Sequence, residues 1–142
     1  MTIKNRTTNA PLKAAVWLRK ILSQRLKREP SVEFAYLFGS ILTRRDARDV
    51  DVAVFLRGRG DPWLSAEDVG RHLEGVLRPR RKVDVRVLND AAAAFAFRVL
   101  EEGMLLWERD RSARLSWEAH ALSRYQDLRP MRDLHDRRFL SR

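Results

Sequence analysis

The chain contains no cysteine, which excludes a disulfide framework and any metal site built on thiolates. It also lacks long apolar runs, and none approaches the roughly 20 residues that a membrane-spanning helix needs. Its first residues, MTIKNRTTNAPLK, carry charges with no apolar core behind them, unlike a signal peptide. Together these absences lead us to expect a soluble, cytoplasmic protein.

What remains is the composition of a folded protein with excess positive charge. The 142 residues are 44% hydrophobic and show no internal repeat, which suits one domain with a real core. The formal net charge of +10 suits a nucleic acid, an acidic protein or a polyanionic nucleotide, and is equally typical of a soluble arginine-rich surface. Because the basic residues are spread along the chain, charge alone selects none of these.

Hydrophobic periodicity predicts helices and strands that alternate along most of the chain. The expected helices cover residues 11–28, 65–78, 89–102 and 112–128, with a short helical turn or loop at 41–47. The expected strands cover residues 34–38, 49–56, 83–88 and 104–107. This order predicts an α/β (α+β) fold, in which helices flank a small mixed β-sheet.

Several residues indicate where these elements begin and end. Ser65, with Asp68 three residues later, resembles a capping box, and Asn89–Asp90 suits the start of the next helix. Gly103 is the expected end of that helix, and Arg129–Pro130 is expected to break or kink the last one.

These signals divide the chain into three parts. We expect a flexible arm over residues 1–9, a minimal catalytic domain over 10–128 and a C-terminal tail over 129–142. The tail carries apolar residues between charges, so it suits a segment that docks on a partner and an ordinary mobile tail equally well.

Three aspartates are the candidate catalytic residues. Asp49 and Asp51 are two apart on an expected strand, so both point to one face while the valines between them point to the other. Alone, this pair also suits the solvated side of a half-exposed strand. Asp84 lies in a second strand of the same alternation, and if the two strands are neighbours it joins the pair. Three carboxylates on one face are costly without a metal, and Mg²⁺ prefers such oxygen ligands.

Gly39–Ser40 precedes the aspartate pair and is the candidate phosphate site. Glycine allows the backbone to approach a phosphate closely, and Ser40 adds a hydroxyl donor at the start of a turn. By itself a Gly-Ser pair is more often an ordinary turn. The combination with two aspartates and a later single aspartate is much more specific than its parts.

At this point the sequence resembles the nucleotidyltransferase superfamily of the DNA polymerase beta type, and within it the minimal MntA-type antitoxins encoded beside HepT (HEPN-domain) toxins. The matching segments are LFGS at 37–40, DVDVAVF at 49–55, VDVRVLNDA at 83–91 and VLEEGMLLWERD at 99–110. The resemblance implies ATP, magnesium and a HepT-like partner toxin. It implies transfer of AMP to a tyrosine hydroxyl of that toxin, which silences the toxin's ribonuclease activity.

The resemblance also assigns roles to residues. Gly39 and Ser40 would hold the triphosphate, Asp49 and Asp51 would bind magnesium, and Asp84 would bind metal and activate the acceptor hydroxyl. The loop between Ser40 and Asp49, ILTRRDAR, is shorter than in many members, and threonine stands where an arginine is usual. Arg44, the next residue, is the expected substitute for the missing phosphate contact.

Three alternatives remain open. The chain could neutralise a toxin by binding alone, with an idle nucleotide site, and the short loop supports that reading. It could modify a small molecule such as an antibiotic, although no further substrate domain is evident. Direct nucleic-acid binding is not expected, but the +10 charge leaves it open.

Overall fold

The computed structural model describes the backbone of residues 12–140 and the side chains of residues 12–128. The helices are α1 (Lys13–Leu26), the 3₁₀ turn η1 (Ser40–Leu42), α2 (Pro62–Val76), α3 (Ala93–Glu102) and α4 (Arg111–Leu140). The strands are β1 (Val32–Phe38), β2 (Val50–Leu56), β3 (Val83–Val87) and β4 (Met104–Glu108). The predicted order of helices and strands is confirmed.

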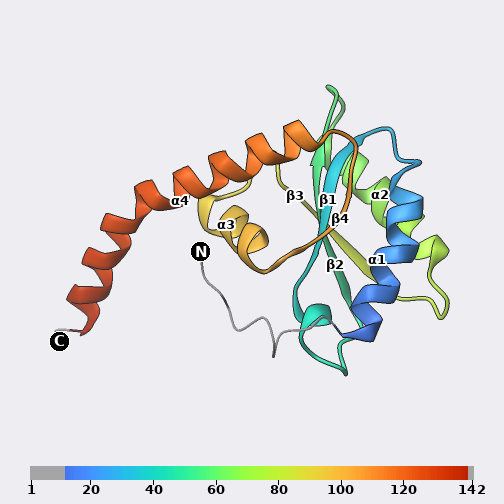
Figure 1. Ribbon diagram of the computed structural model, residues 1–142, viewed down its shortest axis with the longest axis horizontal. Helices are drawn as coiled ribbons and strands as arrows, with labels where there is room; N and C mark the ends of the chain where they lie inside the picture. The colour runs from blue at the N-terminus through green and yellow to red at the C-terminus, as the bar shows by residue number, and fades with distance from the viewer. Residues whose placement is uncertain (1–11, 141–142) are drawn as a thin grey trace.

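The four strands form one mixed sheet in the order β3-β2-β1-β4. β1 pairs antiparallel with β2 and with β4, while β2 and β3 run parallel. Figure 1 shows α1 and α2 on one side of the sheet and α3 and α4 on the other. The predicted α/β class, a small mixed sheet flanked by helices, is therefore confirmed.

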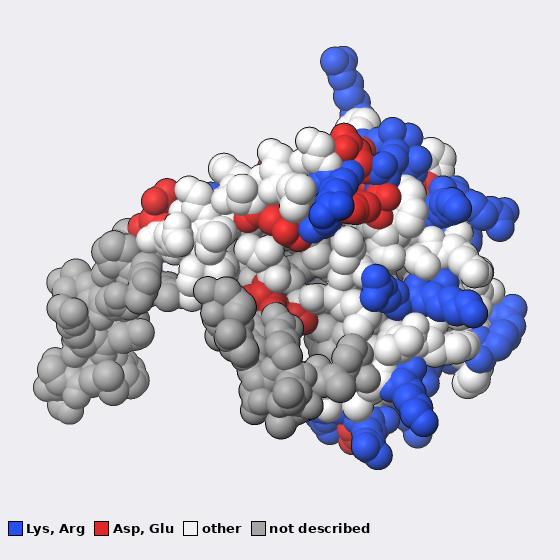
Figure 2. All heavy atoms as spheres, in the orientation of Figure 1, with Lys and Arg blue, Asp and Glu red and all other residues white. Residues whose placement is uncertain are grey.

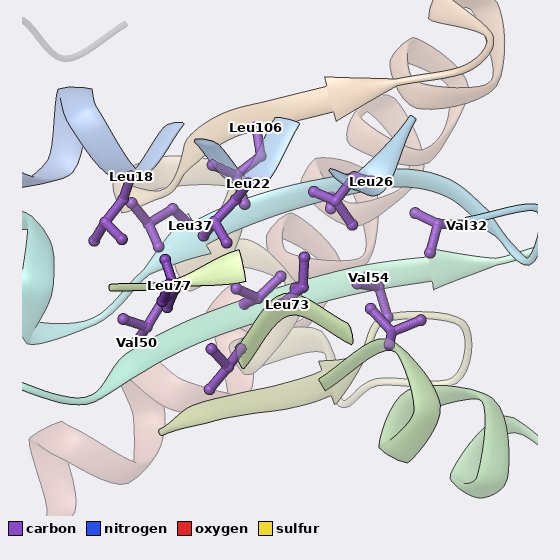
Figure 3. Packing of buried hydrophobic residues seen from close by; sticks show 14 of the residues in the cluster. Leu18, Leu22, Leu26, Val32, Leu37, Val50, Val54, Leu73, Leu77 and Leu106 are labelled. Atoms are coloured by element: carbon purple, nitrogen blue, oxygen red, sulfur yellow. The ribbon is translucent and has the colours of Figure 1, made fainter. Parts of the chain in front are cut away.

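The main core lies between the sheet and the α1/α2 layer. Leu18, Leu22 and Leu26 recur along α1 at helical spacing, and Val69 and Leu73 are buried on α2. Figure 3 shows Leu22 and Leu73 directed toward the strands of the sheet. On β2, Val50, Val52 and Val54 are fully buried on this side. The alternation of the strand sends Asp51 and Ala53 to the opposite side, toward α3 and α4. Burial of the valines thus determines which face carries the aspartate.

A second, aromatic core joins α4 to the other face of the sheet. Trp117 packs against Phe34 and Tyr36, with ring centroids 5.6 Å and 5.7 Å apart. The Tyr36 hydroxyl donates a hydrogen bond to Glu118. Arg114 donates to Glu118 at 3.0 Å and to Glu108 of β4 at 2.8 Å. Burial and the neighbouring Glu118 carboxylate raise the pKa of Tyr36 well above its usual range, so the phenol stays protonated.

Two predicted helix starts are wrong. Helix α2 begins at Pro62 and not at Ser65, because Asp61 accepts a hydrogen bond from the Trp63 N–H at 2.9 Å and proline suits the first helical position. Helix α3 begins at Ala93, because the Asn89 side chain instead pairs with the N–H and C=O of Leu56 at 2.9 Å and 2.7 Å. The predicted helix end at Gly103 is confirmed.

The last helix also differs from its predicted length. Helix α4 continues through Pro130 to Leu140, so residues 129–140 extend the helix that was expected to break or kink at Arg129–Pro130. Its ribbon bends in the C-terminal part and projects away from the body of the domain (Figure 1), in line with the predicted kink. The arm at residues 1–9 lies outside the described residues, and the domain boundaries remain predictions.

Candidate active site at one end of the sheet

The parallel pairing of β2 and β3 brings two of the three predicted aspartates side by side. Asp51 is the register partner of Asp84 on β3 and of Phe38 on β1. The alignment follows from the apolar face, since a slip of one residue would turn every valine of β3 away from α2. The predicted juxtaposition of Asp51 and Asp84 is therefore present in the structure.

Asp49 lies one residue before β2 and completes the group. Asp49 and Asp84 are exposed, whereas Asp51 is partly buried. Burial raises the pKa of Asp51 above its ordinary value of 3.8, and the negative charges of Asp84 and Asp49 raise it further. Both neighbouring carboxylates therefore repel that of Asp51.

Gly39 lies directly against this group. Its φ is +87°, in the left-handed region that side chains disfavour. A Cβ atom at Gly39 would lie 2.4 Å from Oδ2 of Asp51, closer than any real contact. Only glycine therefore lets the end of β1 approach the Asp51 carboxylate in this way.

The turn after Gly39 presents backbone donors to the same region. The carbonyls of Gly39 and Ser40 accept hydrogen bonds from Leu42 and Thr43 at 3.1 Å and 3.0 Å. The N–H groups of Ser40 and Ile41 have no carbonyl partner among the described residues. Free N–H groups at the start of a helical turn favour a bound anion.

Arg44 lies four residues after Ser40, on the same turn, and its backbone N–H donates to the Ser40 carbonyl at 2.8 Å. Its guanidinium donates to both carboxylate oxygens of Asp46, at 3.2 Å and 3.0 Å. Both side chains are mostly exposed, at 66% and 74%. The positive charge of Arg44, the predicted phosphate contact, is thus offset by Asp46 of the same loop.

Carboxylate oxygens suit a hard cation such as Mg²⁺, so the donor chemistry fits the predicted metal. Within the residues that the structure describes, however, no group of three or more histidine, aspartate or glutamate side chains is placed to hold an ion. Asp49 and Asp84 are exposed at strand ends, where few neighbours restrict their rotamers. Their rotation toward Asp51 would assemble the ligand set.

The structure adds two residues to the site that the sequence did not predict, Arg86 on β3 and Phe95 on α3. Arg86 follows Asp84 by two positions on β3, and its guanidinium lies 4.7 Å from the ring centroid of Phe95 on α3. The charges of Arg86 and Arg98 lower the pKa of Asp51, against the effect of its acidic neighbours. Strand alternation alone places Arg86 on the aspartate face. Its aromatic support depends on the position of α3 across the sheet.

An open hollow of about 400 Å³ lies between α2 and β3. Trp63 and Gly70 line it from α2, and Val83, Asp84 and Val85 line it from β3. The two valines belong to the α1/α2 side of the sheet, opposite the face that carries Asp51. Asp84 therefore borders the hollow, whereas Asp49 and Asp51 do not line it.

Surface charge is unevenly distributed in the described part of the molecule. Figure 2 shows lysine and arginine side chains gathered on the side where α1 and α2 lie, with acidic side chains nearer α4. On α1, Lys13, Arg19 and Lys20 are exposed. Among the described residues, no helix combines the length and the apolar character that would let it cross a membrane.

Comparison with solved structures shows the same fold in toxin–antitoxin complexes. A chain of a mutant MntA–HepT toxin–antitoxin matches with a TM-score of 0.68 and 20% identity, covering 86% of this chain and 98% of that one. A toxin–antitoxin structure with AMP-PNP matches with a TM-score of 0.67 and 22% identity over the same shares. A complex of a tri-AMPylated HEPN toxin of Shewanella oneidensis with MNT antitoxin matches at 0.64 and 20%, again over 86% and 98%.

Comparison with sequences gives the family. No curated protein matches this chain. The family described as "Polymerase beta, Nucleotidyltransferase" matches residues 20–112, which is more than half of the chain and includes Gly39, all three aspartates and Arg86. The chain therefore belongs to the polymerase beta nucleotidyltransferase family.

Proposed function

We propose that this protein is an antitoxin that transfers AMP from ATP to a tyrosine hydroxyl of a cognate HepT-like HEPN toxin, and thereby neutralises a ribonuclease. The observation that carries the proposal is the register of Asp51 with Asp84 beside the close approach of Gly39. The likeness to antitoxin chains in complexes with AMP-PNP or with an AMPylated toxin supports the nucleotide and the partner.

In this proposal Asp49, Asp51 and Asp84 hold Mg²⁺. Bound there, the ion would neutralise charge on the phosphates and orient them for displacement. Burial and the repulsion by Asp84 and Asp49 raise the pKa of Asp51, and a cation bound among the three carboxylates would offset that repulsion. Rotation of the exposed Asp49 and Asp84 side chains brings their oxygens toward the partly buried Asp51.

Gly39, Ser40 and Arg44 hold the triphosphate. The N–H groups at the start of η1 and the Ser40 hydroxyl donate to phosphate oxygens. Arg44 leaves Asp46 to do the same, an exchange of one exposed ion pair for another that costs little in water. With no side chain at Gly39, the phosphates and the Asp51 carboxylate can both lie close to the backbone of the turn.

The transfer itself is a displacement at the α-phosphorus. Asp84 accepts the proton of the acceptor hydroxyl, whose oxygen forms a bond to the α-phosphorus. The bond between the α-phosphorus and its bridging oxygen to the β-phosphate breaks, and pyrophosphate leaves with that electron pair. The products are a phosphodiester-linked AMP on the acceptor and free pyrophosphate.

The test uses purified protein, labelled ATP, Mg²⁺ and the product of the neighbouring gene. Label is expected on that partner with the wild-type protein and with Asp68→Asn, which removes one exposed carboxylate on α2. Asp51→Asn and Asp84→Asn are expected to lose transfer by several hundredfold or more. An unlabelled partner with wild-type protein, or equal labelling by all variants, would contradict the proposal.

A second candidate is neutralisation by binding alone. Two observations favour it: the absence of a ready metal group in the described residues and the engagement of Arg44 by Asp46. Under this alternative, Asp51→Ala and Asp84→Ala antitoxins would still protect cells fully at native expression. Loss of protection by folded variants that still bind the toxin would eliminate it.

A further inference from the structure

Arg86 lies on the face of the sheet that carries the aspartates. On β3 it is two residues beyond Asp84, and its register partner on β2 is Ala53, two residues beyond Asp51. Two residues along a strand correspond to about 6.6 Å, within the reach of an arginine side chain.

Phe95 holds that guanidinium in place. The Arg86 Cζ atom lies 4.7 Å from the Phe95 ring centroid. The same ring packs edge-on against Phe38, with centroids 5.4 Å apart at 78°. Phe38 is the last residue of β1 and directly precedes Gly39. The ring therefore joins the end of β1, where the phosphate turn begins, to the cation on β3.

The charge of Arg86 is not offset by an ion pair within residues 12–128, unlike the charges of Arg44 and Arg98. Arg44 is paired with Asp46, and Arg98 lies 3.7 Å from Glu102. Arg86 instead rests on an aromatic face and attracts the Asp51 carboxylate. A guanidinium on an aromatic ring keeps its edge donors free, since stacking uses only its face.

We propose that Arg86, oriented by Phe95, binds a phosphate group of the nucleotide in the transferase site. The inference rests on the proposed function and adds a residue from β3 to a phosphate site otherwise built on the β1–η1 turn. A planar guanidinium can donate two parallel hydrogen bonds to two oxygens of one phosphate, and a fixed orientation favours this contact. The contact also places positive charge where negative charge develops during displacement.

The experiment is calorimetric titration of AMP-PNP with Mg²⁺ into the full chain. Arg86→Gln is expected to weaken binding about ten- to hundredfold, because a charge-assisted contact is lost. Arg86→Lys keeps the positive charge but not the paired guanidinium donors, so it should recover part of the affinity. Phe95→Leu keeps an apolar side chain and should weaken binding about two- to fivefold through loss of orientation.

The matched control is Arg19→Gln. It removes the same charge from an exposed position on α1, across the sheet from the site, and should leave affinity unchanged. Melting curves of every variant separate a phosphate contact from a structural role, since Arg86→Gln should melt with the wild type. The KM for the partner protein is measured in parallel.

The outcomes distinguish this inference from the proposed function. Equal AMP-PNP affinity of Arg86→Gln and wild type overturns the inference alone, as does a rise confined to the KM for the partner, which would place Arg86 at the acceptor. Arg86-dependent nucleotide binding without transfer to the partner overturns the proposed function alone. Wild-type protein that binds no nucleotide overturns both.

Discussion

Replacing Asp51 by asparagine is expected to stabilise the protein while abolishing its activity. Paired strands lie about 4.8 Å apart, and two unit charges at that distance repel by about 1 kcal/mol in water and about 3 kcal/mol at an effective dielectric constant of 20. Asp84 is exposed, so the lower figure applies. We therefore expect Asp51→Asn to gain about 1 kcal/mol, which is a rise in Tm of about 2–5 °C.

The gain should depend on pH in a definite direction. The pKa of Asp51 is raised in the folded state above its ordinary value of 3.8, so the folded protein holds a proton that the unfolded chain has already lost. The wild type therefore loses stability, relative to Asp51→Asn, as the pH rises from 3.8 through the raised pKa. Below that window the carboxyl is protonated in both states, and the advantage of the variant should vanish.

The assay is thermal unfolding in metal-free buffer between pH 3 and pH 8, repeated with Mg²⁺ and AMP-PNP. Ligand at about 100 times its Kd adds about 2.7 kcal/mol, so the ligand should reverse the order of the two Tm values if the variant no longer binds. Asp68→Asn serves as the charge control, because its exposed ion pair with Arg71 is worth little. An Asp51→Asn protein that melts below the wild type in metal-free buffer at pH 7 would refute the repulsion on which the metal argument depends.

Three further predictions test other parts of the structure. Gly39→Ala should lower the free energy of unfolding by about 1–3 kcal/mol and abolish AMP-PNP binding, because the turn has a positive φ and no space for Cβ; normal melting and binding would refute this. Asp61→Ala should cost about 1 kcal/mol by loss of the α2 cap, whereas Ser65→Ala should cost much less, and the reverse order in urea unfolding would restore the capping-box reading. Tyr36→Phe should cost about 1–2 kcal/mol through the lost bond to Glu118, with unchanged transfer activity; an unaltered urea midpoint would show that this bond contributes nothing.

The aspartate pair was predictable because two strands of the same alternation carry it. Valines on one face of β2 and β3 must be buried, so the intervening residues share the other face, and Asp51 and Asp84 come together once the strands are neighbours. The resemblance to a known family indicated that these two strands are neighbours in the sheet. The glycine was predictable as a turn, while its contact with Asp51 Oδ2 depends on the β1–β2 register.

Other features depend on competition between local signals or on tertiary placement. Asp61–Pro62 prevailed over Ser65 at the start of α2, since both suit a helix start and the proline adds a fixed φ. The ion pair between Arg44 and Asp46 depends on the side-chain conformations of two exposed loop residues, and hydrophobic periodicity says nothing about these conformations. Arg86 acquires its support only when α3 places Phe95 over the sheet.

The hydrogen bonds at the start of α4 determine more than local stability. Sliding the helix along its axis by one turn, about 5.4 Å, would separate Arg114 from Glu108 and Glu118 from Tyr36 in a single step. Glu108 and the Tyr36 hydroxyl, both partly buried, would then lose their partners on α4, which favours one axial position of the helix. The far end of α4 projects beyond the domain in Figure 1, and its direction therefore depends on side chains in the first turns of the helix. Substitution of Arg114 is therefore expected to change the direction of the C-terminal part of α4, far from the substituted residue.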